Sequence, residues 1–383
     1  MHPRIRGLAR VRATARCGAA LPAAVSRASS SKAKAAPPEV VFSGIQPTGT
    51  PHLGNYLGLF LPFLELQRST PASTPVYLSV VGLHAITLPQ DPAALVRDRR
   101  NMLASLLACG VDPERTTLFL QEDVREHSEL AWFLNTIAPV GRLQRMTTWK
   151  SKIATARNAN SEDEVSEEDL RLGLLSYPVL QAADILLYKS TIVPVGEDQV
   201  QHLELARDIA QVFNRAFGDV FPVPETRVVP QKRVLSLRDP AQKMSKSAPN
   251  PLSRISLTDS PKDIATKVKG AVTDSTATIT YEPDTRPGVA NLLTIWSAFD
   301  EAKRSPAELA AAAHADGWGA GKLKAAVSDV VAAHLAPVQD EYRRIIADEG
   351  YIRVVAAKGA DRAREQAAKT MAEVRAAVGL GGI

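Results

Sequence analysis

The chain has 383 residues, two cysteines and a net charge of +5 at neutral pH, and its length predicts two domains with a sizeable core. Because Cys17 and Cys109 lie far apart in the sequence, the composition excludes a disulfide framework and a cysteine-rich zinc or iron–sulfur site. The longest apolar stretch, residues 174–187, is interrupted by polar residues and is shorter than the roughly 18 residues of a membrane span, so we expect no membrane contact.

The excess positive charge is confined to the N-terminal segment. Residues 1–38 hold six arginines, two lysines and no acidic residue, whereas the remaining 38 basic and 41 acidic side chains give −3. A segment rich in Arg, Ala and Ser and poor in acids is typical of an organelle transit peptide. We predict that residues 1–38 direct the chain to the mitochondrial matrix and are then removed. A chloroplast address and a disordered basic tail are the alternatives.

Short apolar runs predict the strands of a parallel sheet. Residues 40–42, 76–81, 117–120 and 191–195 are brief, rich in branched or aromatic residues, and bounded by turn residues. Helical patterns lie between them, and Asp91 is predicted to cap a helix that begins at Pro92 and ends before Gly110. This alternation predicts an α/β fold with a Rossmann-like, doubly wound parallel sheet.

A glycine-rich turn, "GIQPTGTPHLGNYLG" at residues 44–58, follows the first predicted strand. Glycine lets the backbone approach a ligand closely, and the N-terminus of the next helix offers free N–H groups to an anion. The turn therefore predicts a nucleotide or phosphate site without proving one. Pro62, inside the helical pattern that follows, is expected to kink that helix because it removes a backbone hydrogen bond.

The strand pattern disappears after about residue 257. From there alanine- and leucine-rich helical segments dominate, with expected breaks that include Pro337 and Gly350, so we predict a second, all-helical C-terminal domain at residues 258–383. Upstream, residues 152–173 include six acids between Glu162 and Asp169 and are interpreted as a solvated loop rather than a site.

A second candidate phosphate site is the loop "LRDPAQKMSKSAPN" at residues 237–250. It places Lys243 and Lys246 three residues apart beside Ser245 and Ser247. Two lysines beside hydroxyl groups can hold a polyphosphate, and a loop can close as charge develops on a leaving pyrophosphate. A surface turn has the same composition, but the coincidence with the glycine-rich turn favours a functional loop.

These motifs resemble a known family. The segment "PHLGN" at 51–55 resembles the HIGH signature, and "KMSKS" at 243–247 matches the second signature, of class I aminoacyl-tRNA synthetases. The segments "FSGIQPTG", "HAIT", "RMTTWK", "YPVLQAADILLY", "VPVGEDQVQHLELARDIAQVFN" and "AVTDS" resemble tryptophanyl-tRNA synthetase in its bacterial and organellar form. The resemblance runs from about Val40 to the end of the chain. It implies that tryptophan and ATP form tryptophanyl-adenylate and pyrophosphate, and that the tryptophanyl group then moves to tRNA(Trp).

The resemblance also implies an ATP site. The implied catalytic residues are His52, Asn55, Lys243 and Lys246. The implied ATP contacts are Gln46, Pro47, Thr48, Gly54, Asn55, Gly196, Glu197, Asp198, Val234, Lys243, Met244, Ser245, Lys246 and Ser247. The run "VPVGEDQ" follows a predicted strand, where doubly wound sheets bind ligands, although its two carboxylates can also simply cap a helix at 198–213. Magnesium is expected to come with the ATP, and no protein metal site is expected.

Asp184 is the expected specificity residue for tryptophan. An acid among apolar neighbours is costly to bury unless it is satisfied, and the indole ring offers one polar group, an N–H donor. Such a site rejects a substrate that leaves the carboxylate unpaired by a factor on the order of 10⁴. An aspartate on a helix surface is the alternative. The other tryptophan-binding residues that the resemblance implies are Phe42, His84, Tyr177, Gln181 and Gln199.

The sequence departs from the family pattern at three positions. Gly82 stands where the family usually has Asp, Ala248 follows the "KMSKS" segment where Asp is usual, and Gln181 replaces a bacterial methionine. Gly82 is expected to loosen a bond near the pocket. Lys150 and Lys152 are equally expected to bind the triphosphate or to be solvent-exposed.

The implied partners are tRNA(Trp) and a second copy of the chain. The resemblance implies a Rossmann-like catalytic domain at 39–257, with a helical insertion and the lysine loop, a tRNA anticodon-binding domain at 258–383, and a homodimer. The basic residues Arg362, Arg364, Lys369 and Arg375 form either a tRNA-binding face or a solvated one. A tyrosyl-tRNA synthetase-like enzyme and a non-catalytic RNA-binding relative are the functional alternatives.

Overall fold

The computed structural model describes residues 37–146, 148–157, 168, 170–196, 199–228, 233–246 and 248–382, all within the compact unit Pro37–Ile383. The predicted transit peptide lies outside the described residues up to residue 36, as do residues 158–167 of the acidic segment. The strands are β1 (Val41–Ile45), β2 (Val76–Val80), β3 (Thr117–Leu120), β4 (Ile192–Val195) and β5 (Glu225–Val228). The helices are α1 (Leu53–Asn55), α2 (Leu61–Ser69), α3 (Gly82–Ala85), α4 (Pro92–Ala108), α5 (Glu126–Asn135), α6 (Val140–Gln144), α7 (Thr148–Arg157), α8 (Leu172–Leu187), α9 (Val200–Phe217), α10 (Pro261–Lys269), α11 (Pro287–Phe299), α12 (Pro306–Ala315), α13 (Ala320–Ala347) and α14 (Glu349–Ala377).

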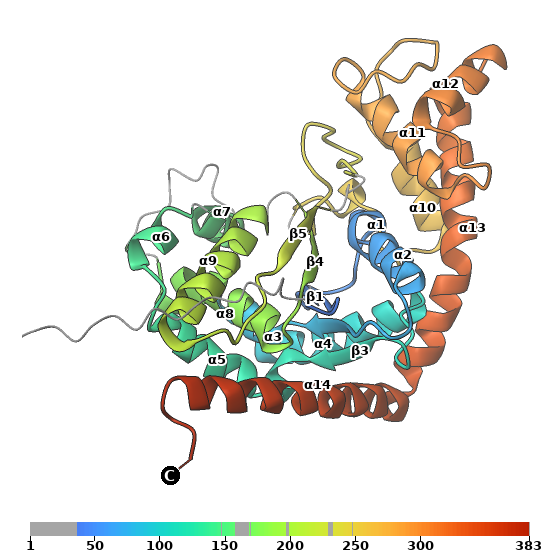
Figure 1. The fold of residues 1–383 in the computed structure, drawn as a ribbon. Helices are drawn as coiled ribbons and strands as arrows, with labels where there is room; N and C mark the ends of the chain where they lie inside the picture. Colours follow the sequence, from blue (N-terminus) through green and yellow to red (C-terminus); the bar gives the residue numbers. More distant parts are fainter. Residues whose placement is uncertain are drawn as a thin grey trace, which may run out of the picture. The chain divides into compact units, whose positions relative to one another are not determined.

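The five strands form one parallel sheet in the order β3-β2-β1-β4-β5 (Figure 1). The chain builds outward from β1 to β3 and then returns to the other side of β1 with β4, so the strand order reverses between β1 and β4. The doubly wound prediction is therefore confirmed, and four of the five strands lie where the sequence predicts them. The edge strand β5 was not predicted, because its sequence, Glu-Thr-Arg-Val, lacks an apolar run.

Helices cover both faces of the sheet, because alternate strand residues point to opposite sides. Val41 and Leu78 belong to a core that includes α2 and α4, whereas Phe42, Tyr77 and Phe119 belong to a core that includes α5, α8 and α9. Burial on both faces explains why β2 reads as a continuous apolar run rather than an alternating one. Among the described residues, no helix combines the length and apolarity needed to cross a membrane.

The predicted irregularity at Pro62 takes the form of a π-helical segment, Tyr56–Phe60, between α1 and α2. The N–H of Leu61 donates to the carbonyl of Tyr56, and Pro62 occupies the first turn of α2. There a proline needs no backbone donor within the helix. The helix α4 begins as predicted, because Asp91 Oδ1 accepts the N–H of Ala94 at 2.6 Å.

The C-terminal third of the described chain is helical, as predicted. Two of the expected breaks are wrong: Pro337 lies inside α13, and Gly350 lies in the first turn of α14. The break falls instead at Asp348, which ends α13 and caps α14 by accepting the N–H of Tyr351 at 2.8 Å. Buried residues on both sides of Pro337, including Leu335 and Ile345, hold α13 together despite the lost hydrogen bond. The domain boundary at 257/258 stays a prediction.

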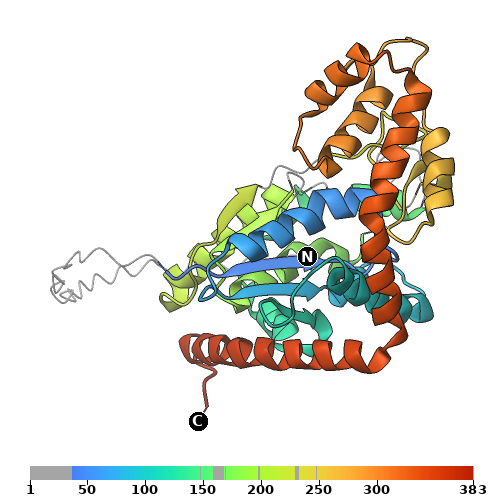
Figure 2. The same cartoon turned by 90° about the vertical axis from the view of Figure 1, so that its right-hand side faces the viewer.

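The last helix, α14, docks on the edge strand β3, as Figures 1 and 2 show. A Cβ atom on Gly359 would lie 1.8 Å from the carbonyl oxygen of Leu118, so only glycine permits this close approach. The helix therefore covers the sheet edge that β3 would otherwise expose.

Cations of α14 secure this docking. Arg362 donates to the carbonyl of Pro113 at 2.9 Å, Arg364 donates to the carbonyl of Asp123 at 2.9 Å, and Arg375 pairs with Glu129. Lys369 bonds Glu365 on the same helix at 2.8 Å. The three arginines therefore contact the catalytic part of the chain, which the sequence analysis did not predict, while Arg364 and Lys369 are also exposed. Binding of tRNA by this face stays a prediction.

Candidate active site

The predicted ATP-binding residues lie where the strand order of the sheet reverses. Gln46 directly follows β1, and Gly196 directly follows β4, so both lie at the carboxyl ends of adjacent strands. Ligands of doubly wound sheets bind at this point. The predicted ATP contacts Glu197, Asp198 and Ser247 lie outside the described residues. The helix predicted at 198–213 is α9, and its N-cap is Gln199.

The lysine loop and the glycine-rich turn are in direct contact. Lys246 Nζ donates to the carbonyl oxygens of Thr48 and Gly49 at 2.5 and 2.9 Å, and it lies 3.3 Å from Thr48 Oγ1. Burial lowers the pKa of the Lys246 ammonium to about 8, although Asp98 raises it. We call residues 44–55 together with 233–246 the ATP end of the site. A partly desolvated cation held by neutral carbonyls is well suited to bind a phosphate.

His52 and Asn55 cap each other at the start of α1. Asn55 Oδ1 accepts the N–H of His52 at 3.1 Å, and the N–H of Asn55 donates to His52 Nδ1 at 3.3 Å. Burial and the nearby cation Lys246 lower the pKa of His52 to about 4, so the ring is neutral at pH 7. Because Nδ1 accepts a hydrogen bond, the single ring proton lies on Nε2, which can donate to a phosphate oxygen.

Gly54 brings the two signature segments together. A Cβ atom on Gly54 would lie 3.0 Å from the His52 ring and 3.7 Å from Met244 Cβ. Met244 is buried and donates its N–H to the carbonyl of buried Val234 at 3.0 Å. Lys243, by contrast, is exposed. The predicted residues of the ATP end thus form one contiguous group, with one lysine held against the turn and the other exposed.

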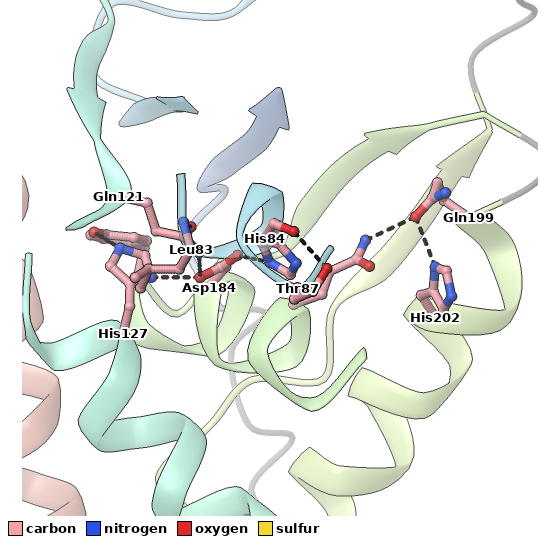
Figure 3. A network of polar contacts seen from close by, with 10 residues as sticks. Leu83, His84, Thr87, Gln121, His127, Asp184, Gln199 and His202 are labelled. Atoms are coloured by element: carbon pink, nitrogen blue, oxygen red, sulfur yellow. Dashed lines mark hydrogen bonds and ion pairs between the residues drawn. The ribbon is translucent and has the colours of Figure 1, made fainter. Parts of the chain in front are cut away.

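Asp184 is buried and bound by three side chains (Figure 3). Its Oδ1 lies 2.7 Å from Gln121 Nε2 and 2.6 Å from His127 Nδ1, whereas its Oδ2 lies 2.8 Å from His84 Nε2. Burial raises the pKa of the Asp184 carboxyl, but His127 and His84 outweigh this effect and lower it to about 2. The carboxylate is therefore ionised, and the alternative of an aspartate on the helix surface is wrong.

Two of the predicted tryptophan-binding residues, Tyr177 and Gln199, meet at His202. Tyr177 Oη lies 2.8 Å from His202 Nε2, and Gln199 Oε1 lies 2.8 Å from His202 Nδ1. Gln181 Nε2 donates to Gln199 Oε1 at 3.3 Å. Lys152 Nζ lies 3.7 Å from the centre of the Tyr177 ring, and burial lowers the pKa of Lys152 to about 8. Lys152 therefore belongs to this cluster and is not a solvent-exposed lysine.

We call these two clusters the tryptophan end, which comprises Phe42, His84, Gln121, His127, Lys152, Tyr177, Gln181, Asp184, Tyr188, Gln199 and His202. Phe42 stacks on Tyr188, the residue that bonds His127, with the ring centres 5.6 Å apart.

The sequence analysis missed Gln121, His127, Tyr188 and His202. Gln121 could have been found, because it directly follows β3 at the carboxyl end of the sheet. His127 lies in the first turn of α5, and no local pattern connects it with Asp184.

Gly82 makes room for an acid from the short 3₁₀ helix Gln121–Asp123, which follows β3. A Cβ atom on Gly82 would lie 2.5 Å from Glu122 Oε2, and Glu122 Oε1 lies 2.5 Å from Arg99 Nε. This glycine allows Glu122 to approach α3. The predicted loosening of a bond near the pocket stays a prediction. The carbonyl of Ala248 accepts Arg254 Nη1 at 3.0 Å.

Metal binding by the protein alone finds no support in the described part of the chain. There, no group of three or more His, Cys, Asp or Glu residues is arranged to hold an ion. The donor set of the ATP end is instead cationic and neutral, which suits phosphate oxygens.

The chain matches known proteins over most of its length. Residues 34–336 match the class I tRNA synthetases for tryptophan and tyrosine (W and Y). The parallel sheet, the reversal of its strand order beside β1 and the two signature segments are thus those of a class I aminoacyl-tRNA synthetase.

Individual relatives narrow this class to one amino acid. The tryptophan–tRNA ligase of Bacillus anthracis is 44% identical over 342 residues, which cover 89% of this chain and 98% of the relative. That of Caulobacter vibrioides is 46% identical over 354 residues, which cover 91% and 97%. The Campylobacter jejuni tryptophanyl-tRNA synthetase, crystallised with ADP and tryptophan, has a TM-score of 0.74 at 32% identity, covering 89% of this chain and 100% of that one. This chain therefore belongs to the tryptophanyl-tRNA synthetase family. The enzymatic activity predicted from its motifs, that of a tryptophan–tRNA ligase, is confirmed at this level.

Proposed function

We propose that this chain activates L-tryptophan with ATP, forms tryptophanyl-adenylate and pyrophosphate, and then transfers the tryptophanyl group to tRNA(Trp). The observation that carries the proposal is the contact of Lys246 with the backbone of Thr48 and Gly49. This contact joins the lysine loop to the glycine-rich turn at the carboxyl end of β1, where a nucleotide would bind.

The ATP phosphates are proposed to lie between the turn and the lysine loop. There Lys246 would exchange its carbonyl partners for phosphate oxygens and offset the charge that develops on the leaving pyrophosphate. His52 would donate from Nε2, because its capping bond occupies Nδ1. Magnesium enters with ATP as part of the substrate, since phosphate oxygens hold the ion without a dedicated protein cage.

The indole ring of tryptophan is proposed to place its N–H against Asp184. Tyr177 and Gln199 would bind the ammonium and carboxylate groups of the amino acid. The Campylobacter jejuni relative, whose structure contains ADP and tryptophan, supports a site that holds a nucleotide and tryptophan together.

The test is pyrophosphate exchange with each of the twenty amino acids. We expect exchange with tryptophan alone, followed by transfer to tRNA(Trp). Exchange with tyrosine alone would identify a tyrosine enzyme. Absence of exchange with any amino acid, together with retained RNA binding, would favour the non-catalytic relative.

The cellular role is proposed to be mitochondrial translation. Supporting this, residues 1–38 have the composition of a transit peptide, and the family match begins only at residue 34. N-terminal sequencing of the protein recovered from isolated mitochondria should show that this segment has been removed. Recovery of the protein with Met1 intact in the organelle would contradict a cleaved transit peptide.

The assembly is proposed to be a homodimer in which residues 258–383 bind the anticodon of tRNA(Trp). Both statements follow from the family resemblance. Light scattering on the purified protein should give twice the mass of one mature chain, and a monomer mass would reject the dimer. Footprinting of bound tRNA should show protection of the anticodon.

A further inference from the structure

The hydrogen-bond donors around Asp184 can be assigned by starting from the backbone N–H of Leu83. The backbone N–H of Leu83 can only donate, so Gln121 Oε1, 3.0 Å away, must accept. The amide nitrogen of Gln121 therefore faces Asp184 and donates to Oδ1 at 2.7 Å. Gln121 thus occupies one acceptor position of Oδ1. Turning its amide around would break its bonds to both Leu83 and Asp184.

His127 can be assigned in the same way. Its Nδ1 lies 2.6 Å from Asp184 Oδ1, and its Nε2 lies 2.8 Å from Tyr188 Oη. Because an ionised carboxylate only accepts, Nδ1 carries a proton. Tyr188 Oη is the second polar partner of the ring, at Nε2. Tyr188, His127 and Asp184 thus form a chain of hydrogen bonds that ends at the carboxylate.

The two oxygens of Asp184 are consequently unequal. Oδ1 accepts two hydrogen bonds, from Gln121 and His127, whereas within the described residues Oδ2 accepts one, from His84. A carboxylate oxygen has about two acceptor positions, so Oδ2 keeps one for a ligand.

The geometry also distinguishes the two sides of the carboxylate. His84, which bonds Oδ2, makes an edge contact with the ring of Tyr177, one of the proposed tryptophan ligands. His127 is fully buried and lies on the other side of Asp184 from His84 (Figure 3). Its ring contacts the rings of Phe119 and Tyr188. Oδ2 therefore faces the substrate side, and His127 does not touch the substrate.

We propose that His127, oriented by Tyr188, is a positioning residue that turns Asp184 so that Oδ2 is the acceptor for the indole N–H. The inference rests on the proposed function, because it takes Asp184 as the group that selects tryptophan. Loss of His127 would leave Oδ1 with the Gln121 amide alone, so the carboxylate would be held less firmly in this orientation and the enzyme would lose part of its preference for a ring that carries an N–H donor.

The test compares tryptophan with an isosteric analogue, 3-benzothienylalanine, in which sulfur replaces the indole N–H. Pyrophosphate exchange gives kcat/KM for both, and their ratio measures recognition of the N–H. For His127→Ala we expect kcat/KM for tryptophan to fall about 10- to 100-fold, the range for a hydrogen bond to a charged group. The value for the analogue and the KM for ATP should change little.

Two milder variants keep the test decisive where the alanine variant fails to fold. His127→Asn supplies an amide N–H near the position of Nδ1 and should restore most of the ratio. Tyr188→Phe preserves packing but removes the hydrogen-bond partner of His127 Nε2, so the ratio should fall about fivefold, the effect of one hydrogen bond. His314→Ala, at an exposed histidine of α12, is the matched control and should keep the ratio. Thermal denaturation establishes which variants are folded.

The results separate this inference from the function on which it rests. If the wild-type protein exchanges with tryptophan and the folded His127 and Tyr188 variants lose equal activity with both substrates, the positioning role is overturned and the proposed function stands. If the wild-type protein does not exchange with tryptophan, the proposed function fails and the inference falls with it.

Discussion

The ATP end and the tryptophan end of the site are built in different ways. The ATP end consists of two short segments, each with its functional residues close together in the sequence, and Lys246 joins them by bonding the carbonyls of Thr48 and Gly49. The tryptophan end is a network of side chains from several helices and strands, in which Asp184 bonds residues 57, 63 and 100 positions away. Phosphate binding therefore rests on local motifs, whereas recognition of the amino acid depends on the packing of the whole sheet.

The largest expected effect would break the ATP end alone. Lys246→Ala should lower the rate of adenylate formation about 10²- to 10³-fold, because it removes a charge that acts on the leaving pyrophosphate. Tryptophan binding should change little, which single-turnover kinetics and equilibrium titration can separate. Lys262→Ala, at an exposed lysine of α10, is the control. Equal losses in rate and tryptophan affinity would contradict a transition-state role.

The next effect would break the tryptophan end. Asp184→Ala should raise the KM for tryptophan sharply, by about 10²-fold, and leave the KM for ATP nearly unchanged. It should also reduce the free energy of unfolding, by about 3 kcal/mol, because buried donors of His84, Gln121 and His127 lose their acceptor. Exchange kinetics and urea denaturation measure the two losses. An unchanged tryptophan KM would remove Asp184 from the pocket.

The close packing of α14 on β3 can be tested at Gly359. Gly359→Ala would force a Cβ atom against the carbonyl of Leu118, next to the strand end that carries Gln121. We expect a loss of about 1–3 kcal/mol in the free energy of unfolding, as for other overpacked contacts. Gly321→Ala, where a Cβ atom meets nothing within 4 Å, should cause no such loss. Equal stability of the two variants would show that α14 tolerates a wider separation.

The smallest expected effect is the pH dependence of ATP binding, which separates the two lysines from His52 because their pKa values differ. Burial lowers the pKa of Lys246 and Lys152 to about 8, below the usual value of 10.5, so both lose their charge in the free enzyme as the pH rises above 8. Loss of the Lys246 charge at the ATP end should then lower the affinity for ATP, by up to about tenfold per pH unit. His52, with its pKa lowered to about 4, should cause no change between pH 5 and 8. His52→Gln should therefore leave the pH profile of ATP binding between pH 5 and 8 unchanged, and loss of a titrating group near pH 6.5 in this variant would contradict a neutral His52.

The same two lysines should make the free energy of unfolding rise with pH, in the range where ATP affinity falls. Their folded-state pKa lies below the unfolded value, so the unfolded chain binds more protons between about pH 8 and 10.5. The contribution of these groups to the free energy of unfolding therefore rises as the pH increases through this range. Urea denaturation at pH 7.5 and 9.5 checks the direction, with Lys152→Met as the reference for one of the two groups.

Much of the sheet could be predicted because burial on both faces gives brief, continuous apolar runs. That signal located four strands, and the capping residue Asp91 located α4. It failed for β5, whose charged residues suit an edge strand, and for Pro337, where tertiary packing keeps α13 continuous. The helix or strand propensity of a single residue is a weak guide where long-range contacts stabilise the element by more free energy than an unfavourable residue costs it.

The sequence by itself was enough to identify the glycine-rich turn, the lysine loop and Asp184 as candidate binding residues, because the residues next to each of them in the sequence indicate its chemical role. Only the tertiary structure decided that Lys246 meets the turn and that the arginines of α14 hold the sheet edge. It also decided that His127 and Gln121 support Asp184. The physical reason is that hydrogen bonds and close packing depend on distance in space, and the register of a parallel sheet brings together residues that no local pattern connects.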